Sequence, residues 1–146
     1  MNVLVSAHSG LRYVVLLLLV MAIVNAAMNL KSENYLKKDK MINLFAMVIL
    51  HIQLLLGLIL YFVSNKVKFG EGVMGIPLHR FYDLEHPLMM IVGILLITLG
   101  RKKAEKSAIP QLKHKLILRY YFIGLVIIFI SIPWPFIYKE LGAGYF

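Results

Sequence analysis

Four long apolar runs, separated by short polar connections, constrain this chain more than any other feature. They cover residues 4–30, 41–63, 77–100 and 120–137, the third being most apolar from Leu84 onward. A membrane-spanning helix needs about 20 mostly apolar residues, and these runs reach or approach that length. We therefore predict an all-α integral membrane protein, with residues 1–146 forming one transmembrane domain, a four-helix up-down bundle.

The composition excludes several other classes of protein. Hydrophobic residues make up 60% of the chain and charged residues 16%, whereas soluble domains have about 45–50% and about 25%. A soluble enzyme domain, a nucleic-acid-binding module and a disordered tail are excluded on these grounds. The absence of cysteine excludes disulfides, thiolate metal sites and iron–sulfur clusters. A signal peptide is the competing interpretation of the first run, but we expect a membrane span, because no basic residue precedes the run and no convincing cleavage site follows it.

Lysine and arginine are distributed unevenly among the connections. Eleven lie in the first and third connections, and four lie in the second connection and the C-terminal tail. Loops rich in these residues stay on the cytoplasmic side, so we predict a multi-pass protein of the bacterial inner membrane with both termini outside. The basic residues lie between apolar runs and lack interleaved base-stacking aromatics, so no nucleic-acid partner is expected. The bilayer itself is the expected partner, and the basic loops would contact its anionic lipids.

Two other segments are expected at the outer surface. The connection from Asn65 to Asp83 contains Gly70, Gly72 and Gly75 and is predicted to be an outer loop. Trp134, between two prolines, and Tyr138 are predicted to anchor the end of the fourth span at the membrane interface.

Ionisable residues inside the spans mark a function or a buried pair. They are His8 and Arg12 in the first span, His51 in the second and His86 in the third. Each helical residue advances about 100°, so His8 and Arg12 share one helix face. His51 points about 200° away from Gln53, and we expect His51 to form a helix-to-helix hydrogen bond.

Glycines accompany these polar faces. Gln53 and Gly57 share a face of the second span, and His86 shares a face with Gly93 in the third. Two imidazoles at matching depth on two helices, with glycines beside them, are what axial haem ligation in a bundle requires. His8 and His86 would then ligate the iron, the gaps at Gly57 and Gly93 would admit the porphyrin, and Arg12 would pair with a propionate.

The depths of the two histidines do not match if the basic residues mark the membrane edge. On that measure His8 lies about 34 Å from Lys31, and His86 about 22 Å from Arg101. Pairing of His51 with His86, or of His8 with His79, therefore remains an alternative.

Three short segments resemble one half of the haem A synthase family: His8-Ser9-Gly10-Leu11-Arg12, Gln53-Leu54-Leu55-Leu56-Gly57 and Glu85-His86. The chain also resembles the short four-span bacterial proteins labelled cytochrome b-like. The resemblance implies that His8 and His86 are the axial ligands and that Gln53 and Gly57 line the haem.

The chain departs from haem A synthase in three respects. It has one half instead of two, it lacks the outer-loop cysteine pair, and Glu71 does not lie in a motif matching the catalytic carboxylate. We therefore do not expect haem A synthesis by this chain alone, and no catalytic residue is assigned.

Simpler interpretations of the same residues remain open. His8 could bond near the headgroups, His86 beside Pro87 could belong to a capped helix start, and the glycines could serve helix packing. The remaining polar candidates are expected to be solvated loop residues: His79, Arg80 and His114.

The leading hypothesis is a membrane protein with one haem b per chain that transfers electrons near the outer leaflet. Its partners would be quinone or a respiratory complex, of which it could be a subunit, and it could form homo- or hetero-oligomers. The alternative is a cofactor-free accessory or assembly subunit. A transporter is the third hypothesis, but it lacks support from an inverted repeat or a broken helix.

Overall fold

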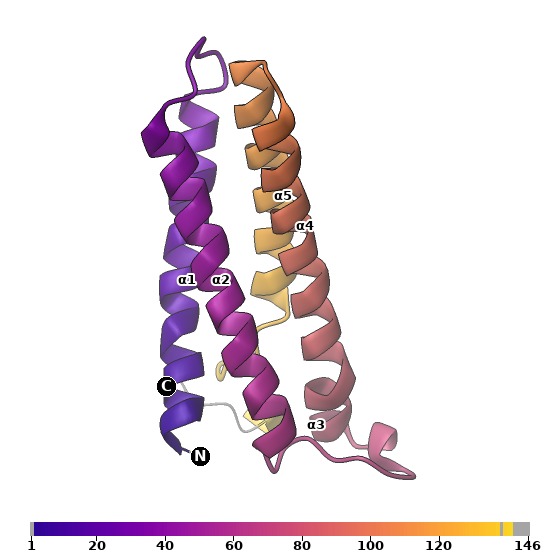
Figure 1. The fold of residues 1–146 in the computed structure, drawn as a ribbon. Coiled ribbons are helices and arrows are strands. Elements are labelled where there is room, and N and C mark those ends of the chain that lie inside the picture. Colours follow the sequence, from indigo (N-terminus) through magenta and orange to yellow (C-terminus); the bar gives the residue numbers. More distant parts are fainter. Residues whose placement is uncertain (1, 138, 142–146) are drawn as a thin grey trace.

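The computed structural model describes residues 2–137 and 139–141, which form helices and no strand. Four long helices lie side by side as a bundle (Figure 1), which confirms the all-helical architecture predicted from the apolar runs. They are α1 (Asn2–Met28), α2 (Lys37–Val63), α4 (His86–Lys106) and α5 (Pro110–Ile130). The short elements are η1 (Val73–Gly75), α3 (Pro77–Arg80), the π-helical turn η2 (Phe81–Glu85) and η3 (Lys139–Leu141).

Among the residues that the structure describes, three helical segments are long and apolar enough to cross a membrane: Val3–Met28, Lys37–Val63 and Pro77–Lys106. The last of these combines α3, η2 and α4 into one continuous helical segment. The fourth long helix, α5, carries Lys113, Lys115 and Arg119 in its first half, which lowers its mean hydropathy. The predicted span of 120–137 also differs from the structure, because the helix begins at Pro110 and ends at Ile130.

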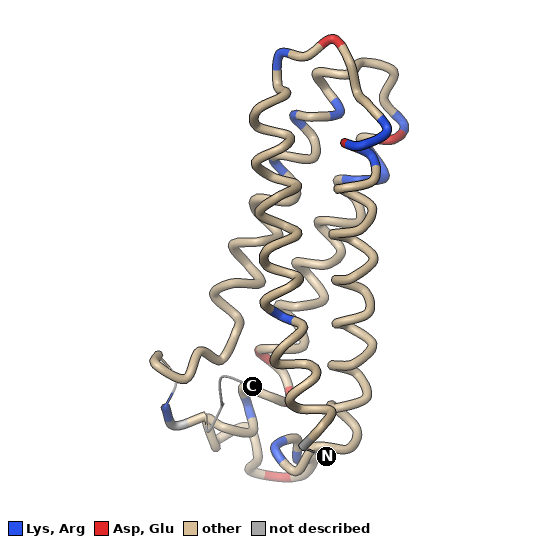
Figure 2. Tube along the Cα trace, turned by 90° about the vertical axis from the view of Figure 1, so that its left-hand side faces the viewer, with Lys and Arg blue, Asp and Glu red and all other residues tan. Residues whose placement is uncertain are grey.

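The basic connection predicted between the third and fourth runs is largely helical. Helix α4 continues to Lys106 and α5 begins at Pro110, so only residues 107–109 lie outside the two helices. Most lysines and arginines lie at this end of the bundle, together with the 29–36 connection (Figure 2). The opposite end holds the start of α1, the 64–76 connection and η3 (Figure 1).

The two pairs of consecutive helices pack more closely than the helices between the pairs. Helix α4 packs most extensively on α5, where Gly93 and Gly124 bring the backbones together. A Cβ on Gly93 would lie 2.8 Å from Ile128 Cγ1, and a Cβ on Gly100 would collide with Tyr120. The contact between α2 and α4 is the sparsest of the four neighbouring helix pairs.

Large apolar side chains cover the outside of the bundle. Leu17 is 60% exposed, Leu55 60%, and Phe62 77%. Soluble monomers rarely expose apolar surface on this scale, whereas a bilayer solvates it. The exposed surface is therefore compatible with contact to lipid.

A buried polar cluster lies at the basic end. Tyr121 donates a hydrogen bond to the Asn43 carbonyl (2.8 Å), and the Asn43 amide donates to the Tyr35 hydroxyl (2.9 Å). His114 is fully buried, 3.2 Å from the Asn34 carbonyl and in edge contact with the Tyr35 ring. The prediction that His114 is a solvated loop residue is therefore wrong, because it belongs to α5. Burial raises the pKa of Tyr35, in the connection, to about 12.

Candidate functional site

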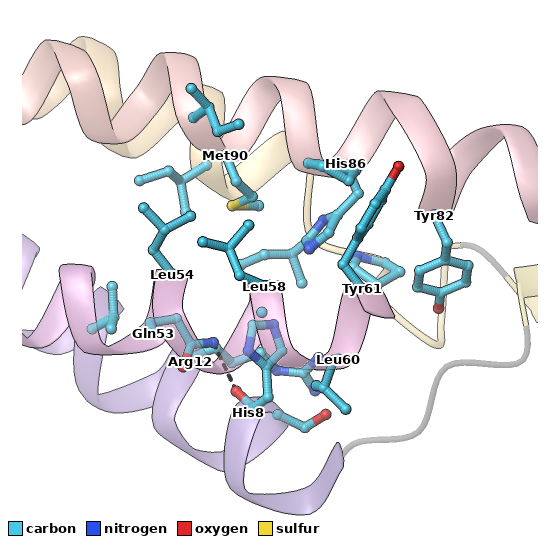
Figure 3. A pocket seen from close by; sticks show the side chains of 18 of the residues that line it. His8, Arg12, Gln53, Leu54, Leu58, Leu60, Tyr61, Tyr82, His86 and Met90 are labelled. Atoms are coloured by element: carbon cyan, nitrogen blue, oxygen red, sulfur yellow. Dashed lines mark hydrogen bonds between the residues drawn. The ribbon is translucent and has the colours of Figure 1, made fainter. Parts of the chain in front are cut away.

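His8 and His86 lie on opposite sides of one cavity at the end of the bundle away from the basic cluster. Their ring centroids are 6.5 Å apart and their planes are inclined at 80°. Figure 3 shows the His8 ring extending from α1 and the His86 ring extending from α4 toward each other. The short distance between the rings places the two residues at similar depth. Each also lies 20 residues before the end of its helix, His8 before Met28 and His86 before Lys106.

The mismatch in depth expected from the basic residues is thus removed. Arg101 does not mark the end of its helix, since α4 continues through it to Lys106. Each histidine lies about 30 Å along its helix from the basic end. The His8–His86 pair is therefore the one that the fold brings together.

The His86 ring is held by the chain that follows α5. Its Nδ1 lies 2.8 Å from the carbonyl oxygen of Ser131. A carbonyl can only accept a hydrogen bond, so Nδ1 carries the proton and Nε2 is left with its lone pair. Phe81 stacks on the ring at 5.7 Å with an interplanar angle of 29°. A carbonyl partner on the second nitrogen is the usual way in which a metal-binding histidine is oriented.

The His8 ring is placed by α2. The Gln53 amide donates a hydrogen bond of 2.8 Å to the His8 carbonyl, which fixes the separation of α1 and α2. Gly57 leaves space for the ring, since a Cβ there would lie 3.1 Å from His8 Cε1. His8 Nδ1 is buried and has no hydrogen-bond partner among the described residues. Buried polar atoms are nearly always paired, so this atom marks a position where a further group would be stabilised.

The π-helical turn before His86 has a local cause in Pro87. In an α-helix the N–H of residue 87 would bond the carbonyl of residue 83, but proline has no N–H. The Asp83 carbonyl instead accepts a hydrogen bond of 3.1 Å from the Tyr61 hydroxyl of α2. Helix α4 thus begins at His86 with Pro87 in its first turn, as the interpretation of a helix start expects, but no side chain caps this start, and the helical segment continues back to Pro77.

The cavity between the histidines has a volume of about 240 Å³. Its wall is mostly aliphatic and includes Leu54, Leu58 and Met90 from the facing sides of α2 and α4 (Figure 3). Its polar lining comes from α1, α2, η2, α4 and the 64–76 connection. These lining residues are His8, Ser9, Arg12, Gln53, Tyr61, Ser64, Lys66, Tyr82 and His86.

Arg12 lines the cavity one turn further along α1 than His8. Its Nη2 donates to the Tyr13 hydroxyl (3.0 Å), and its guanidinium carbon lies 5.5 Å from the centre of the Trp134 ring. Trp134 is itself only 7% exposed and donates from Nε1 to the Phe129 carbonyl (3.0 Å). The predicted anchor role of Trp134 therefore does not fit its position, since the ring is buried beneath Arg12. Tyr138, predicted to share that role, lies outside the described residues.

Three other candidates from the sequence lie away from the cavity. Gly93 packs against α5, where Ile128 and the Gly124 carbonyl occupy the space that a cofactor was expected to use. His51 Nδ1 is 2.8 Å from the Met47 carbonyl and its Nε2 is 3.5 Å from Thr98 Oγ1, so it bridges α2 and α4 as expected for a helix-to-helix contact.

His79, the remaining alternative ligand, bonds through Nδ1 to the Lys66 carbonyl (2.8 Å) in the 64–76 connection. It is partly buried rather than freely solvated. The structure thus gathers His8, Arg12, Gln53, Gly57 and His86 around one cavity and leaves Gly93, His51 and His79 outside its wall.

The spacing of the two imidazoles suits a shared metal ion. Two imidazole nitrogens bound at about 2.0–2.1 Å to one ion place their ring centres about 6 Å apart, close to the 6.5 Å observed. No three His, Cys, Asp or Glu side chains come together among the described residues to hold an ion by themselves. A haem needs only two protein ligands, because the porphyrin supplies four.

Comparison of the chain with models of known protein families, with curated proteins and with solved structures finds no match.

Proposed function

We propose that this chain is a membrane protein that binds one b-type haem between His8 and His86 and transfers electrons. The observation that supports it best is the pair of imidazoles facing each other at 6.5 Å, one of them oriented by the Ser131 carbonyl. Haem iron would supply the one-electron redox chemistry, and the protein would set the axial ligands, the burial and the charge around it.

Each lining residue has a definite role in this proposal. His8 and His86 present ring nitrogens to the iron, and Gly57 provides the space that the His8 ring needs. Gln53 holds the backbone of His8 at a fixed distance from α2. Arg12 would pair with a propionate by turning from Tyr13 toward the cavity.

A macrocycle needs more room than 240 Å³, since ligand pockets commonly measure about 300–1,000 Å³. The side chains that would move lie between α2 and α4, the two neighbouring helices with the sparsest contact in the bundle. Leu58 is already 41% exposed there, and Met90 is an adaptable, unbranched side chain. Movement of these side chains toward the lipid would enlarge the cavity between α2 and α4 and leave the α4–α5 contact unchanged.

The proposed topology follows from the segregation of charge. The basic end lies in the cytoplasm by the positive-inside rule, α5 serves as the fourth span, and the histidine cavity lies near the outer leaflet of a bacterial inner membrane. Both termini are then outside. An electron partner near that leaflet would be quinone or a respiratory complex, and contact with such a complex would make the chain one subunit of a hetero-oligomer.

The test is a visible spectrum of the chain purified in mild detergent, oxidised and then reduced with dithionite. We expect sharp α and β bands on reduction and about one haem per chain by the pyridine haemochrome assay. A folded chain that remains colourless after haem is supplied would contradict the proposal. Two haems per chain would contradict the single site.

A cofactor-free accessory subunit is the second candidate, and Arg12 is the residue that favours it. Its guanidinium already has partners within the chain, the Tyr13 hydroxyl and the Trp134 ring, as a self-sufficient bundle requires. The buried Nδ1 of His8, which has no hydrogen-bond partner in the described part of the chain, counts against it. The same spectrum separates the two candidates.

A further inference from the structure

Three groups of the chain hold the His86 ring. Its Nδ1 lies 2.8 Å from the carbonyl oxygen of Ser131. Phe81 stacks on its face with the ring centres 5.7 Å apart, and the Tyr82 ring meets it at 6.5 Å and an angle of 60°. A hydrogen bond at the edge of the ring and an aromatic ring on its face together restrict rotation of the imidazole. His86 therefore presents its Nε2 in one orientation.

The π-helical turn η2 makes the contact with Phe81 possible. Phe81 and His86 are five residues apart, and residues at this spacing in an α-helix lie about 140° apart around the axis. In η2 the His86 N–H bonds to the Phe81 carbonyl, so the two side chains lie one turn apart on the same face. The distortion of the helix thus brings an aromatic ring onto the face of His86.

The His8 ring is held by fewer contacts. Its Nδ1 is buried and has no hydrogen-bond partner in the described part of the chain. The Gln53 amide bonds to the His8 carbonyl and so holds the backbone instead of the ring. The Gln53 backbone also approaches the ring, but with a smaller effect on it than burial has.

This difference makes His8 the weaker of the two ligands. Metal-binding histidines almost always bond through their second nitrogen to a carbonyl, a carboxylate or water, and this bond orients the ring and raises its basicity. His86 has such a partner in Ser131. For His8 Nδ1 no such partner exists among the described residues.

We infer that His86 is the permanent ligand of the iron and that His8 is the exchangeable ligand, whose place on the reduced iron is taken by a small uncharged molecule such as carbon monoxide. The inference rests on the proposed haem site and adds a ligand-binding activity to it. The exchange breaks the bond from His8 to the iron and forms one from carbon monoxide, with no change in oxidation state. The mostly aliphatic wall favours an uncharged ligand, since burying an unpaired charge is costly.

The experiment is a titration of the haem-loaded, dithionite-reduced chain with carbon monoxide in mild detergent, followed through the Soret and α bands. Two variants disturb one ligand each. Gly57→Ala crowds His8, because its methyl group would lie 3.1 Å from His8 Cε1. Phe81→Leu removes the ring that stacks on His86.

Each variant has a matched control. Gly10→Ala is the control for the added methyl group, because nothing lies within 4 Å of a Cβ at that position. Phe45→Leu is the control for the lost aromatic ring, because Phe45 is 53% exposed and does not line the cavity. Each spectrum is normalised to the haem content of the sample by the pyridine haemochrome assay.

We expect the unmodified chain to bind carbon monoxide and to lose its sharp α band. Gly57→Ala should reach half-saturation at about a tenfold lower concentration, because a ligand displaced from its position typically binds about 10–100-fold less tightly. Phe81→Leu and both controls should bind carbon monoxide as the unmodified chain does. Equal affinity in Gly57→Ala and the unmodified chain would overturn the role of His8. Tighter binding by Phe81→Leu alone would identify His86 as the ligand that leaves.

A second measurement uses the unmodified chain and so does not depend on haem retention by a variant. NMR of the reduced form saturated with carbon monoxide should show one coordinated imidazole, in nuclear Overhauser contact with the ring of Phe81. A coordinated imidazole without this contact would overturn the assignment of His86 as the permanent ligand.

Failure of the proposed function would look different. The unmodified chain would then show no haem bands before carbon monoxide is added. A chain with the spectrum of two histidine ligands that does not respond to carbon monoxide would keep the proposed function and overturn the exchange at His8.

Discussion

His86 Nδ1 lies 2.8 Å from the carbonyl oxygen of Ser131, the residue that follows the last turn of α5. This hydrogen bond joins the third apolar segment to the end of the fourth. It fixes both the rotation of the imidazole and the nitrogen that carries the proton. Nε2 is therefore the nitrogen available to a ligand, on the side where His8 approaches.

Replacing either histidine of the pair should remove haem binding. His8→Ala and His86→Ala each delete one axial ligand, so we expect loss of the sharp reduced α band and of most bound haem. His51→Ala is the control, because His51 bonds to Met47 and Thr98 and does not line the cavity. Haem retained by His8→Ala but lost by His51→Ala, measured by pyridine haemochrome, would assign the ligand to α2 instead.

Gly57→Ala should weaken haem binding through contact with His8. The new methyl group would lie 3.1 Å from His8 Cε1, so the ring has to move. Displacing a group that orients a metal ligand typically costs about 10–100-fold in affinity. Gly10→Ala is the matched control, because nothing lies within 4 Å of a Cβ at that position. The measurement is haemin titration, and equal affinities for the two variants would show that the approach of Gly57 to His8 has no role in binding.

Arg12→Met should lower the midpoint potential of the bound haem. Removing a positive charge stabilises the oxidised iron relative to the reduced iron. A unit charge about 10 Å away contributes about 1.7 kcal/mol at an effective dielectric constant near 20, which is about 70 mV for a one-electron couple. Spectroelectrochemical titration measures the shift. Lys68→Met provides the control for an exposed charge, whose effect is screened by solvent and salt. An unchanged midpoint potential in Arg12→Met would show that the charge of Arg12 does not act on the haem.

Tyr121→Phe should destabilise the fold without affecting the cavity. The change removes a fully buried hydroxyl that donates to the Asn43 carbonyl at 2.8 Å. Loss of such a bond costs about 1 kcal/mol, measurable by unfolding in detergent. Tyr120→Phe is the control, since the Tyr120 hydroxyl only accepts from Lys103 in an exposed contact. A change in the haem spectrum of Tyr121→Phe would show that the two ends of the bundle are coupled.

Hydropathy and helical spacing predicted much of the arrangement. Apolar runs located the helices, and a rotation of 100° per residue separated Gln53 from His51, the one lining the cavity and the other bonding to Thr98. Helix ends are harder to predict, because basic residues can lie within a helix instead of marking its end. Arg101 lies inside α4, and this displaced the apparent depth of His86.

Other parts of the site depend on contacts between distant segments. The Ser131 carbonyl carries no signal in the sequence, since any residue has one. Gly93 and Gly57 look alike in their helices, and only the neighbouring helix decides that one faces α5 and the other faces His8. Pro87 did carry a usable signal in the sequence. A proline within a helix has no N–H, so the carbonyl of residue 83 lacks its usual donor. The Tyr61 hydroxyl donates to this carbonyl instead.

The contributions to the cavity also set an order of events during biosynthesis. His8 comes from α1, Gly57 from α2, His86 from α4, and the carbonyl that orients His86 from the residue after α5. As the chain leaves the ribosome, the first hairpin enters the bilayer with only one of the two histidines. In the proposed haem site, loading would therefore follow insertion of the second hairpin, and a ribosome-bound chain stopped before Ser131 should take up no haem.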